Sequence, residues 1–588
     1  MKLRPFANLF ALRHPDPQLR DRVAAALVAS GRFAEVWRPA PSWICAIAPL
    51  PDGELDSADT RALGLAFAEG RDTLAGDVAA QPRERIGRVA ELARTAPERL
   101  AELPGDFGFI HFSPDDSALA VRSCAGWVPF YEHADGTTVA FGTRLDDFAR
   151  FLPTEPKLDP LVIAVWGGKP CFPDRRTFLT GVKLVPQGCT RQVTTAGAVK
   201  AIRYWNPEKH VGERHSPAAE REHPERLRAL LLRALERDLL PNGGNLLWLS
   251  GGVDSSAMGA LAAGAAKKPV WTWSLLPERE DLYQEEMSYI EPLARQYGFA
   301  RRWEVRYGRD TRMNLLRSAP QTLFPQLHPG MGDLPRVLRE GPVRVVFGGE
   351  FADEVCGSYC TLPDWVEQTP LHTVLGQIGA GKCPAKDFGR WLKHRWLATT
   401  RRPMLPFLPE LPKFIHSDVR AEYREWLDRR RRAAGEEPAA WRYLTLRLGC
   451  DDYATMNWEG TSALNLRRSF PFLQREVIEL AYACHPAELI RPGHKLLLRR
   501  ALELDVPAHN LNRVDKGAWG RFNVPSHYSP AQKLPALVAP MVRKDWFPQP
   551  PDELSYYEAS RMEQFSLTAR NFSSCLAARS TVQSSKLI

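Results

Sequence analysis

The residues whose types and spacing best suit chemistry are Ser250-Gly251-Gly252-Val253-Asp254-Ser255-Ser256, directly after the apolar run 246–249. The run predicts a buried strand, the glycines predict a turn, and the Ala-rich stretch 257–266 predicts a helix. Backbone N–H groups and two hydroxyls would then point together at the N-terminus of that helix, where an anion is stabilised. No Gly-Lys-Ser/Thr follows at the Walker spacing, so a different kind of phosphate loop is predicted. An ordinary glycine turn without a ligand is the alternative.

A second apolar run, 343–347, also ends in glycines followed by acids, with Gly349, Glu350 and Asp353 at the turn. Because ligands collect at the carboxyl ends of parallel strands, Asp254 and Asp353 are candidate ligands for one Mg²⁺. Magnesium prefers a few carboxylates together with phosphate oxygens. Taken alone, Asp353 is equally typical of a helix N-cap. Beside a phosphate loop, the metal interpretation is favoured.

Composition sets outer bounds on function. A chain of 588 residues predicts more than one domain, and a net charge of +9, from 78 basic and 69 acidic residues, does not require a nucleic-acid partner. Ten cysteines without a CxxC pair argue against a zinc site or a disulfide framework. Since no run of about 18 apolar residues occurs and residues 1–12 lack a long apolar core, we expect a cytoplasmic protein without a membrane span or signal peptide.

The distribution of apolar runs predicts an α+β part followed by an α/β part. Residues 1–152 show short apolar runs broken by Pro, Gly and Asp, which predicts mostly antiparallel strands with a few helices. Residues 153–216 form a predicted connector with one more strand pair. From 217 to 576, strands alternate with helices, which predicts a parallel sheet covered on both faces and then a helical C-terminal extension. The polar end, 577–588, is predicted to be disordered.

Taken together, these motifs resemble the asparagine synthetase superfamily, whose synthetase domain carries a Ser-Gly-Gly-x-Asp-Ser loop and a later Gly-Glu-Gly-x-Asp-Glu segment. The likeness covers nearly the whole chain, and its further matching stretches are 105–109, 126–131, 141–143, 158–160, 184–188, 203–205, 470–473, 495–499 and 513–517. The resemblance implies an N-terminal sandwich like that of class II glutamine amidotransferases. It also implies an ATP-pyrophosphatase (adenine nucleotide α-hydrolase-like) domain that uses ATP and Mg²⁺ and releases AMP and pyrophosphate.

The same resemblance assigns roles to single residues. Asp254 and Asp353 would bind Mg²⁺, and Glu350 would lie near the attacking amine. Lys516, in the loop 513–517, would stabilise charge on the α-phosphate as pyrophosphate leaves. The residues expected to hold the nucleotide and its pyrophosphate are Leu249, Ser250, Gly251, Gly252, Asp254, Ser255, Ser256 and Gly349.

Departures from the family pattern bear on the substrate. Glutamine-hydrolysing members begin, after Met removal, with a cysteine, whereas this chain has Lys2. The family's Asn-Gly-Glu turn also has no counterpart between 63 and 89. Without the thiolate no thioester forms, so we expect the N-terminal half to be a scaffold that has lost its chemistry. Phe351 replaces the second glycine of Gly-Glu-Gly, and Arg467 replaces a family glutamate, which indicates a different acceptor pocket.

Two branches of the superfamily that lack this cysteine, β-lactam synthetases and lasso peptide cyclases, join an adenylated carboxylate to an amine of the same molecule. The second half of the chain is rich in Trp, and we expect most of these residues in the core and one or two in a peptide groove; they are Trp365, Trp391, Trp396, Trp426, Trp441 and Trp458. A lasso peptide isopeptide-bond-forming cyclase is the favoured prediction. Its expected partners are a leader-free precursor peptide and a leader peptidase or leader-binding protein, with no nucleic acid and no membrane. A β-lactam synthetase, an ammonia-dependent asparagine synthetase and a non-enzymatic ATP-binding scaffold are the alternatives.

Overall fold

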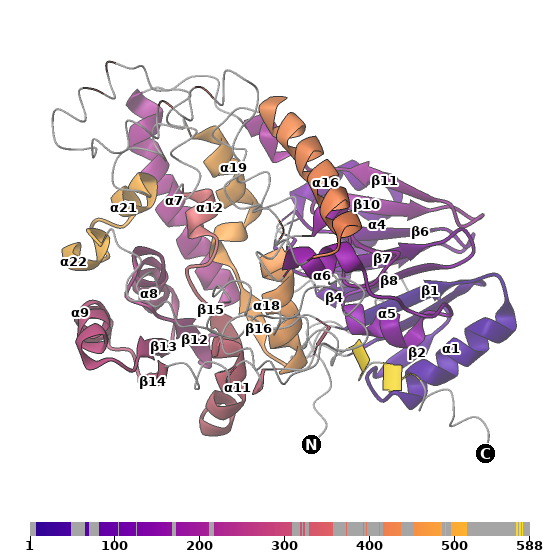
Figure 1. Cartoon of the computed structure of the whole chain (residues 1–588), viewed down its shortest axis with the longest axis horizontal. Helices are drawn as coiled ribbons and strands as arrows, with labels where there is room; N and C mark the ends of the chain where they lie inside the picture. Colours follow the sequence, from indigo (N-terminus) through magenta and orange to yellow (C-terminus); the bar gives the residue numbers. More distant parts are fainter. Residues whose placement is uncertain are drawn as a thin grey trace.

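The computed structural model describes most of the chain. Within the described part, the first half holds two antiparallel sheets and the second half a parallel sheet (Figure 1). The described residues are 8–48, 65–69, 82–166 without 104 and 125, 172–210, 217–307, 329–356, 415–436, 452–484 and 495–513, with a few single residues between and beyond them.

The first half is mainly antiparallel, as the sequence predicted. One sheet has the order β2-β3-β1-β8-β7-β9 and the other β11-β10-β6-β5-β4. The strand pair expected in the connector is formed by β10 and β11, and it extends the second sheet because β10 pairs with β6. A further connector strand, β9, pairs with β7 of the first sheet. The elements are β1 (Leu9–Arg13), α1 (Pro17–Ala29), β2 (Glu35–Trp37), β3 (Trp43–Ile47), β4 (Leu65–Glu69), α4 (Pro82–Thr95), β5 (Gly108–Phe112), β6 (Ala118–Arg122), β7 (Tyr131–Ala134), β8 (Val139–Gly142), α5 (Leu145–Phe151), α6 (Pro160–Trp166), β9 (Val182–Leu184), β10 (Cys189–Val193) and β11 (Val199–Arg203).

Strand β1 illustrates how this half is packed. All five of its residues are buried, and successive side chains point to opposite faces. Leu9 and Ala11 lie in a core formed by residues of both sheets. Phe10 and Leu12 lie in a second core on the other face, where Phe148 of α5 contacts Phe10 edge to face at 5.5 Å. A strand that is covered on both faces therefore carries an unbroken apolar run rather than an alternating one.

The second half is built on a parallel sheet with the strand order β14-β13-β12-β15-β16. Leu247 of β12 packs in the core that contains α8, and Leu246 and Trp248 pack in the opposite core with α11. The predicted alternation of strands and helices is confirmed. The elements are α7 (Pro217–Asp238), β12 (Asn245–Trp248), α8 (Val253–Ala265), β13 (Trp271–Pro277), α9 (Glu280–Tyr297), β14 (Arg301–Tyr307), α11 (Pro329–Glu340), β15 (Val345–Phe347) and α12 (Ala352–Val355).

Helix α8 begins at Val253, four residues earlier than the stretch 257–266 predicted. Gly252 is its N-cap, in an extended conformation with φ −73° and ψ 162°. Asp254 adds an acid to the first turn, which the helix dipole favours. The polar residues 254–256 thus lie within the first turn of a helix rather than in a loop before it.

Residues Arg467–Ser469 form a strand, β16, in a region that the sequence led us to expect as helical. The strand pairs in parallel with β15. Its three residues are polar and yet buried, so the apolar pattern that normally marks a central strand is missing. Ion pairs and hydrogen bonds replace it: Arg468 pairs with Glu350, and Ser469 donates to Asp238. The later elements are α16 (Ser417–Glu436), α18 (Asp452–Ala463), β16, α19 (Arg475–Ala483), α21 (Leu496–Ala501) and α22 (Ala508–Leu511).

Helix α18 joins the two halves. Ala454, Met456 and Trp458 lie in three different cores, one of the parallel sheet and two of the antiparallel half. Glu459 accepts hydrogen bonds from the Tyr131 hydroxyl and the Leu145 backbone N–H, both at 3.0 Å. Figure 1 shows α18 between the parallel sheet and the antiparallel sheets. Since β16 follows α18 directly, the antiparallel half supports a strand of the parallel sheet.

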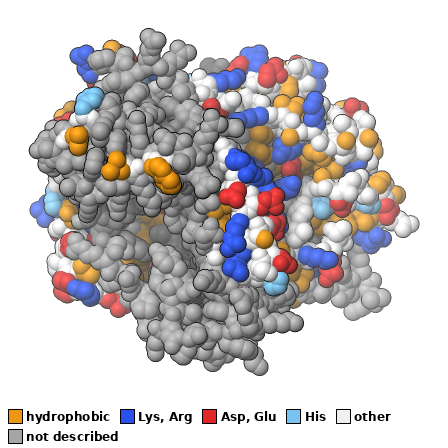
Figure 2. Space-filling view, turned by 45° about the horizontal axis from the view of Figure 1, so that its top comes forward, with side chains coloured by type: hydrophobic (Ala, Val, Ile, Leu, Met, Phe, Trp, Pro, Cys, Tyr) orange, Lys and Arg blue, Asp and Glu red, His pale blue; other side chains and the backbone are white. Residues whose placement is uncertain are grey.

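The described surface mixes charges of both signs. Figure 2 shows acidic and basic side chains next to one another on the face that it presents, so among the described residues the positive surplus forms no continuous basic face there. Arg429 of α16 illustrates this, with Glu425 and Asp174 each 2.9 Å away. Of the helices that the structure describes, none has the length and apolarity needed to cross a bilayer.

Ala577 and Arg579, in the segment predicted to be disordered, are helical. Arg579 donates hydrogen bonds to the backbone carbonyls of Thr154 and Pro153, at 3.0 and 3.1 Å. The remainder of 577–588 lies outside the described residues.

Candidate functional site

The phosphate-loop residues follow strand β12 as predicted, and hydrogen bonds fix the point where the strand ends. The Leu249 backbone N–H donates to the Trp273 carbonyl at 2.9 Å, and its own carbonyl accepts from the Ser274 hydroxyl at 2.7 Å. Ser250 is exposed, and its hydroxyl lies 3.0 Å from that of Ser255. The loop therefore leaves a rigid sheet edge and returns onto the first turn of α8.

Gly251 and Gly252 shape the turn. Gly251 has φ +71°, and a Cβ at this position would lie 2.7 Å from Cβ of Tyr289, so only glycine fits. The first hydrogen bond of α8 runs from the Ser256 N–H to the Gly252 carbonyl at 2.9 Å. The N–H groups before Ser256 have no partner within the helix, which is the usual basis of anion binding at a helix N-terminus.

The second glycine loop lies directly against the first. A Cβ at Gly349 would lie 2.4 Å from Cβ of Asp254 and 2.7 Å from the backbone nitrogen of Ser255. A larger residue at 349 would therefore push the ends of β12 and β15 apart. The structure brings these predicted site residues together, as the parallel sheet requires.

The ammonium group of Lys495 lies between the two carboxylates predicted to bind metal. Its Nζ is 2.6 Å from Asp353 Oδ1 and donates a hydrogen bond to Asp254 Oδ2. Lys495 directly precedes α21 and has a left-handed backbone, with φ +55°, which is uncommon for a residue with a Cβ. Asp254 and Asp353 thus meet as predicted, around a lysine to which the sequence analysis gave no role.

Electrostatics explains why a cation belongs at this point. Burial raises the pKa of Asp254 to about 6, while Lys495 opposes this rise and Asp353 adds to it. Burial alone would lower the pKa of Lys495, but the two carboxylates outweigh burial and raise it. Burial also raises the pKa of the neighbouring Cys356 thiol. Two carboxylates this close need a positive charge between them, and Lys495 supplies one.

The oxygen donors of this site fit magnesium. Asp254 Oδ1 and Glu350 Oε2 are buried and accept no hydrogen bond from the described residues. Among those residues no group of three or more His, Cys, Asp or Glu side chains could enclose a metal ion. Asp254 and Asp353 would hold the ion, in keeping with the preference of Mg²⁺ for few carboxylates plus phosphate oxygens. When bound, it would neutralise charge on the triphosphate.

Glu350 is held in place by a residue that the sequence analysis missed. Arg468 of β16 is fully buried and pairs through Nη2 with Glu350 Oε1. Its guanidinium also lies 3.9 Å over the Trp248 ring. A Cβ at Gly348 would come within 2.6 Å of Glu350 Oε2, so the absence of a side chain at 348 leaves room for the carboxylate. No motif marked Arg468 in the sequence, and only strand pairing places it beside Glu350.

Phe351, the departure from Gly-Glu-Gly, keeps a glycine-like backbone. Its φ is +70°, in the left-handed region that a bulky residue rarely adopts. Its ring packs edge to face on Phe470, with centroids 5.4 Å apart. The other departure, Arg467, is buried, with Nη2 3.9 Å from Asp238 Oδ1. Both departures thus form part of the packing behind the second glycine loop.

Lys516 lies outside the described residues, which end at Arg513 in this segment, so its role stays a prediction. The last described residues contact the phosphate loop. Asn510 of α22 donates to the Gly251 carbonyl at 3.1 Å, and Arg513 pairs with Glu286 of α9 at 2.8 Å. Neither residue was predicted to have a role from the sequence.

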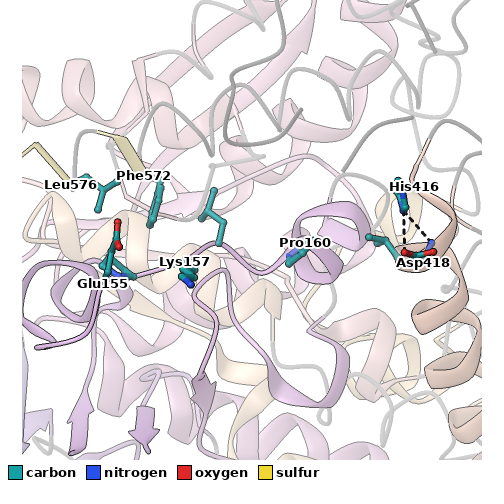
Figure 3. Close-up of a pocket in the computed structure, with 10 residues that line it drawn as sticks. Glu155, Lys157, Pro160, His416, Asp418, Phe572 and Leu576 are labelled. Atoms are coloured by element: carbon teal, nitrogen blue, oxygen red, sulfur yellow. Dashed lines mark hydrogen bonds and ion pairs between the residues drawn. The ribbon is translucent and has the colours of Figure 1, made fainter. Parts of the chain in front are cut away.

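A separate pocket of about 500 Å³ shares no residue with the glycine loops. Glu155 and Lys157 lie along one part of it, and Phe572 and Leu576 close the same end (Figure 3). At the other end, His416 and Asp418 contact each other, with His416 Nδ1 3.7 Å from Asp418 Oδ2. It contains neither glycine loop nor the Asp–Lys–Asp arrangement, so it is distinct from the candidate site described above.

Comparisons with known proteins agree with this geometry. "Asparagine synthetase [glutamine-hydrolyzing] 3" of Bacillus subtilis (strain 168) is 25% identical over 278 residues, which cover 44% of this chain and 44% of that protein. A "Putative asparagine synthetase [glutamine-hydrolyzing]" of Mycobacterium tuberculosis (strain ATCC 25618 / H37Rv) is 26% identical over 457 residues, 71% of this chain and 67% of that protein. The family model for asparagine synthase matches residues 226–572, which include both glycine loops and Lys495. More than half of the chain is matched, and the chain therefore belongs to the asparagine synthase family.

Proposed function

We propose that this chain is an ATP-dependent carbon–nitrogen ligase that closes the macrolactam ring of a lasso peptide. In the first step, an Asp or Glu side-chain carboxylate of the leader-free precursor attacks the α-phosphorus of ATP, and pyrophosphate leaves. In the second, the N-terminal amine of the same peptide attacks the acyl carbon, AMP leaves and one proton is lost. The general class, ATP-dependent amide formation, is supported by the family match.

One observation carries the proposal: Asp254, Lys495 and Asp353 meet beside an N-terminal region, residues 1–152, whose cysteines are all buried. Asp254, Lys495 and Asp353 are in contact. Cys45 and Cys124 are the only cysteines in residues 1–152, and both are buried. Burial raises the pKa of the Cys124 thiol, which further weakens it as a nucleophile. The amine would therefore come from a source other than glutamine hydrolysed by this chain.

A peptide α-amine suits this site. Its pKa of about 7.7–8.0 leaves roughly a quarter of it neutral near pH 7.4, so positioning matters more than proton abstraction. Glu350, held by Arg468, is the acceptor that would orient its N–H groups. Of the aromatic residues considered for a peptide groove, Trp426 and Trp458 are buried core residues, whereas Trp396 is 64% exposed. Trp396 is therefore the described Trp that offers a surface to a peptide.

The test uses the full chain with Mg²⁺, ATP and a leader-free precursor peptide encoded beside its gene, carrying a free N-terminus and an internal Asp or Glu. The expected products are AMP, pyrophosphate and a peptide that has lost one water and no longer reacts with amine labels. The same peptide with an acetylated N-terminus should not cyclise, because its nucleophile is blocked. Formation of ADP instead of AMP would contradict the reaction class.

Two further incubations separate the alternatives. Glutamine should yield no glutamate, since Cys45 and Cys124, the cysteines of residues 1–152, are both buried. Aspartate with ammonium salts should yield no asparagine, and its formation without peptide cyclisation would favour the ammonia-dependent asparagine synthetase instead. A leader peptidase or leader-binding protein added to the reaction should raise the rate of cyclisation only if it delivers the peptide to this chain.

A further inference from the structure

Asn510 is a buried side chain that reaches the phosphate loop from the C-terminal segment. It is fully buried in α22, and its Nδ2 donates to three acceptors. These are the Gly251 carbonyl at 3.1 Å, the Ser256 hydroxyl at 3.1 Å and the Tyr289 carbonyl at 2.9 Å. An amide nitrogen has two hydrogens, so one of them is shared between acceptors. A single side chain thus contacts the glycine turn, the first turn of α8 and the body of α9.

The contact with the Gly251 carbonyl sets the direction of a peptide unit. In a trans peptide the C=O and the following N–H point in opposite directions. Holding the Gly251 carbonyl towards Asn510 therefore turns the Gly252 N–H to the opposite side. Glycine rotates readily between backbone conformations, so nothing at 251 itself prevents this peptide from flipping.

The contact with Ser256 has a similar consequence. Because Asn510 Nδ2 is a donor, the Ser256 oxygen is the acceptor, and its own hydrogen remains available for another oxygen. Ser256 is fully buried beside the loop and is one of the residues expected to hold pyrophosphate. Asn510 thus fixes the orientation of two groups, the Gly252 N–H and the Ser256 hydroxyl, so that both can donate hydrogen bonds.

Asn510 is itself firmly held. The Arg513 guanidinium pairs with Glu286 at 2.8 Å, and both side chains are buried. The same guanidinium lies 4.0 Å over the Tyr289 ring, and His509 stacks on that ring at 4.2 Å. Arg499 of α21 donates to the Arg513 carbonyl at 2.8 Å. Residues 508–513 are therefore attached to α9 at several points, and Asn510 enters the loop from a fixed base.

We propose that Asn510 is a positioning residue for the nucleotide: it orients the 251–252 peptide and the Ser256 hydroxyl towards the phosphates of ATP. The C-terminal segment then forms part of the nucleotide site, and the phosphate loop alone is not sufficient. This rests on ATP binding at the loop and is independent of which acid and amine are joined. Loss of an outer partner of a metal ligand typically costs about 10- to 100-fold in affinity, and we expect a loss of that size here.

The experiment compares full-length wild type, Asn510→Ala and Asn512→Ala. Asn512 is exposed at the end of the same short helix and serves as the matched control. Binding of Mg²⁺ with α,β-methylene-ATP, which cannot be cleaved at the α–β bond, is measured by calorimetry. Asn510→Ala should raise the Kd about 10- to 100-fold, and Asn512→Ala should leave it unchanged. Asn510→Asp should bind the analogue at least as weakly as Asn510→Ala, because its carboxylate would face the Gly251 and Tyr289 carbonyl oxygens.

Adenosine distinguishes positioning from general loosening of the fold. Since it has no phosphates, its binding, followed by ligand-observed NMR, should be equal in wild type and Asn510→Ala. Equal losses for adenosine and the ATP analogue would overturn the proposal, as would an Asn510→Ala Kd within twofold of wild type. Should Asn510→Ala not fold, Asn510→Ser is measured in the same way and judged by the same criteria. A wild type that does not bind the analogue at all would instead refute nucleotide binding at this loop.

Discussion

Lys495 Nζ lies 2.6 Å from Asp353 Oδ1 and also contacts Asp254, so one ammonium group neutralises the two acids that the sequence offers to magnesium. The three side chains come from α8, α12 and the residue before α21, which are far apart in the chain. Lysine and metal would therefore share the same two carboxylates.

Lys495→Ala should lower stability by about 1–3 kcal/mol, because two partly buried carboxylates lose their counter-charge. Magnesium should restore much of this, since a bound cation replaces the missing charge and binds only the folded chain. Thermal unfolding with and without Mg²⁺ should show a larger Mg²⁺-dependent rise in Tm for the variant than for wild type. The double variant Lys495→Ala with Asp353→Asn should regain stability without Mg²⁺. A Tm shift with Mg²⁺ no larger than that of wild type would count against the shared site.

Arg468 and Glu350 should act as a unit in amide formation. Arg468→Met should lower turnover about 10- to 100-fold by releasing the carboxylate, and Arg468→Lys should not restore it, since lysine cannot pair with Glu350 and cover the Trp248 ring in the same way. Glu350→Gln should lower turnover by a similar factor. The double variant Arg468→Met with Glu350→Gln should lower it no further than either single variant, because the two side chains act together.

The step that is affected can be separated by two assays on the peptide substrate. Exchange of labelled pyrophosphate into ATP reports adenylation, and peptide cyclisation reports both steps. Cyclisation should fall far more than exchange in both variants, because Glu350 is expected to orient the amine. Equal losses in the two assays would place the pair in adenylation instead.

The interface between the two halves should give a pH-dependent stability through Glu459. Burial raises the pKa of Glu459 to about 7 from an ordinary 4.5, while Arg144 opposes this rise and Asp146 adds to it. Between pH 4.5 and 7 the folded protein therefore holds a proton that the unfolded chain has lost, so this group's contribution to stability falls as pH rises.

Glu459→Gln removes that dependence while keeping an oxygen for the Tyr131 hydroxyl. The free energy of unfolding of wild type minus that of the variant should fall by about 1–3 kcal/mol from pH 4.5 to pH 7 and then level off. Chemical unfolding at a series of pH values measures this difference, and other titrating groups cancel in it. A difference that stays constant across the range would show that Glu459 is ionised throughout.

The sequence predicted the layers of the fold and the two glycine loops, because both depend on local signals. Apolar runs identified strands such as β12 and β15, and the order of strands and helices indicated a parallel sheet whose strand ends converge. Asp254 and Asp353 could be paired from this alone. The start of α8 was placed four residues late, because the polar residues 254–256 do not resemble the Ala-rich remainder of the helix.

Residues that reach the site through tertiary contacts could not be predicted. Lys495 stood in a matched stretch without a stated role, and its contact with two acids depends on how α21 packs. Strand β16 consists of Arg467, Arg468 and Ser469, whose burial is stabilised by distant partners and not by an apolar pattern. Asn510 donates to groups more than two hundred residues away in sequence. Such contacts appear only once the chain is folded.

Phe351 allows backbone strain to be separated from side-chain packing. Phe351→Gly loses the edge-to-face contact with Phe470 but relaxes a backbone held at φ +70°. Phe351→Ala loses the same contact and keeps a Cβ in the left-handed region, which costs about 1–2 kcal/mol. The glycine variant should therefore be the more stable of the two by about 1 kcal/mol, the reverse of the usual order of Ala and Gly. Urea unfolding of both variants measures this difference. If Phe351→Ala is the more stable variant, the left-handed conformation at 351 is not retained once the ring is gone, and the ring contact rather than the loop imposes it.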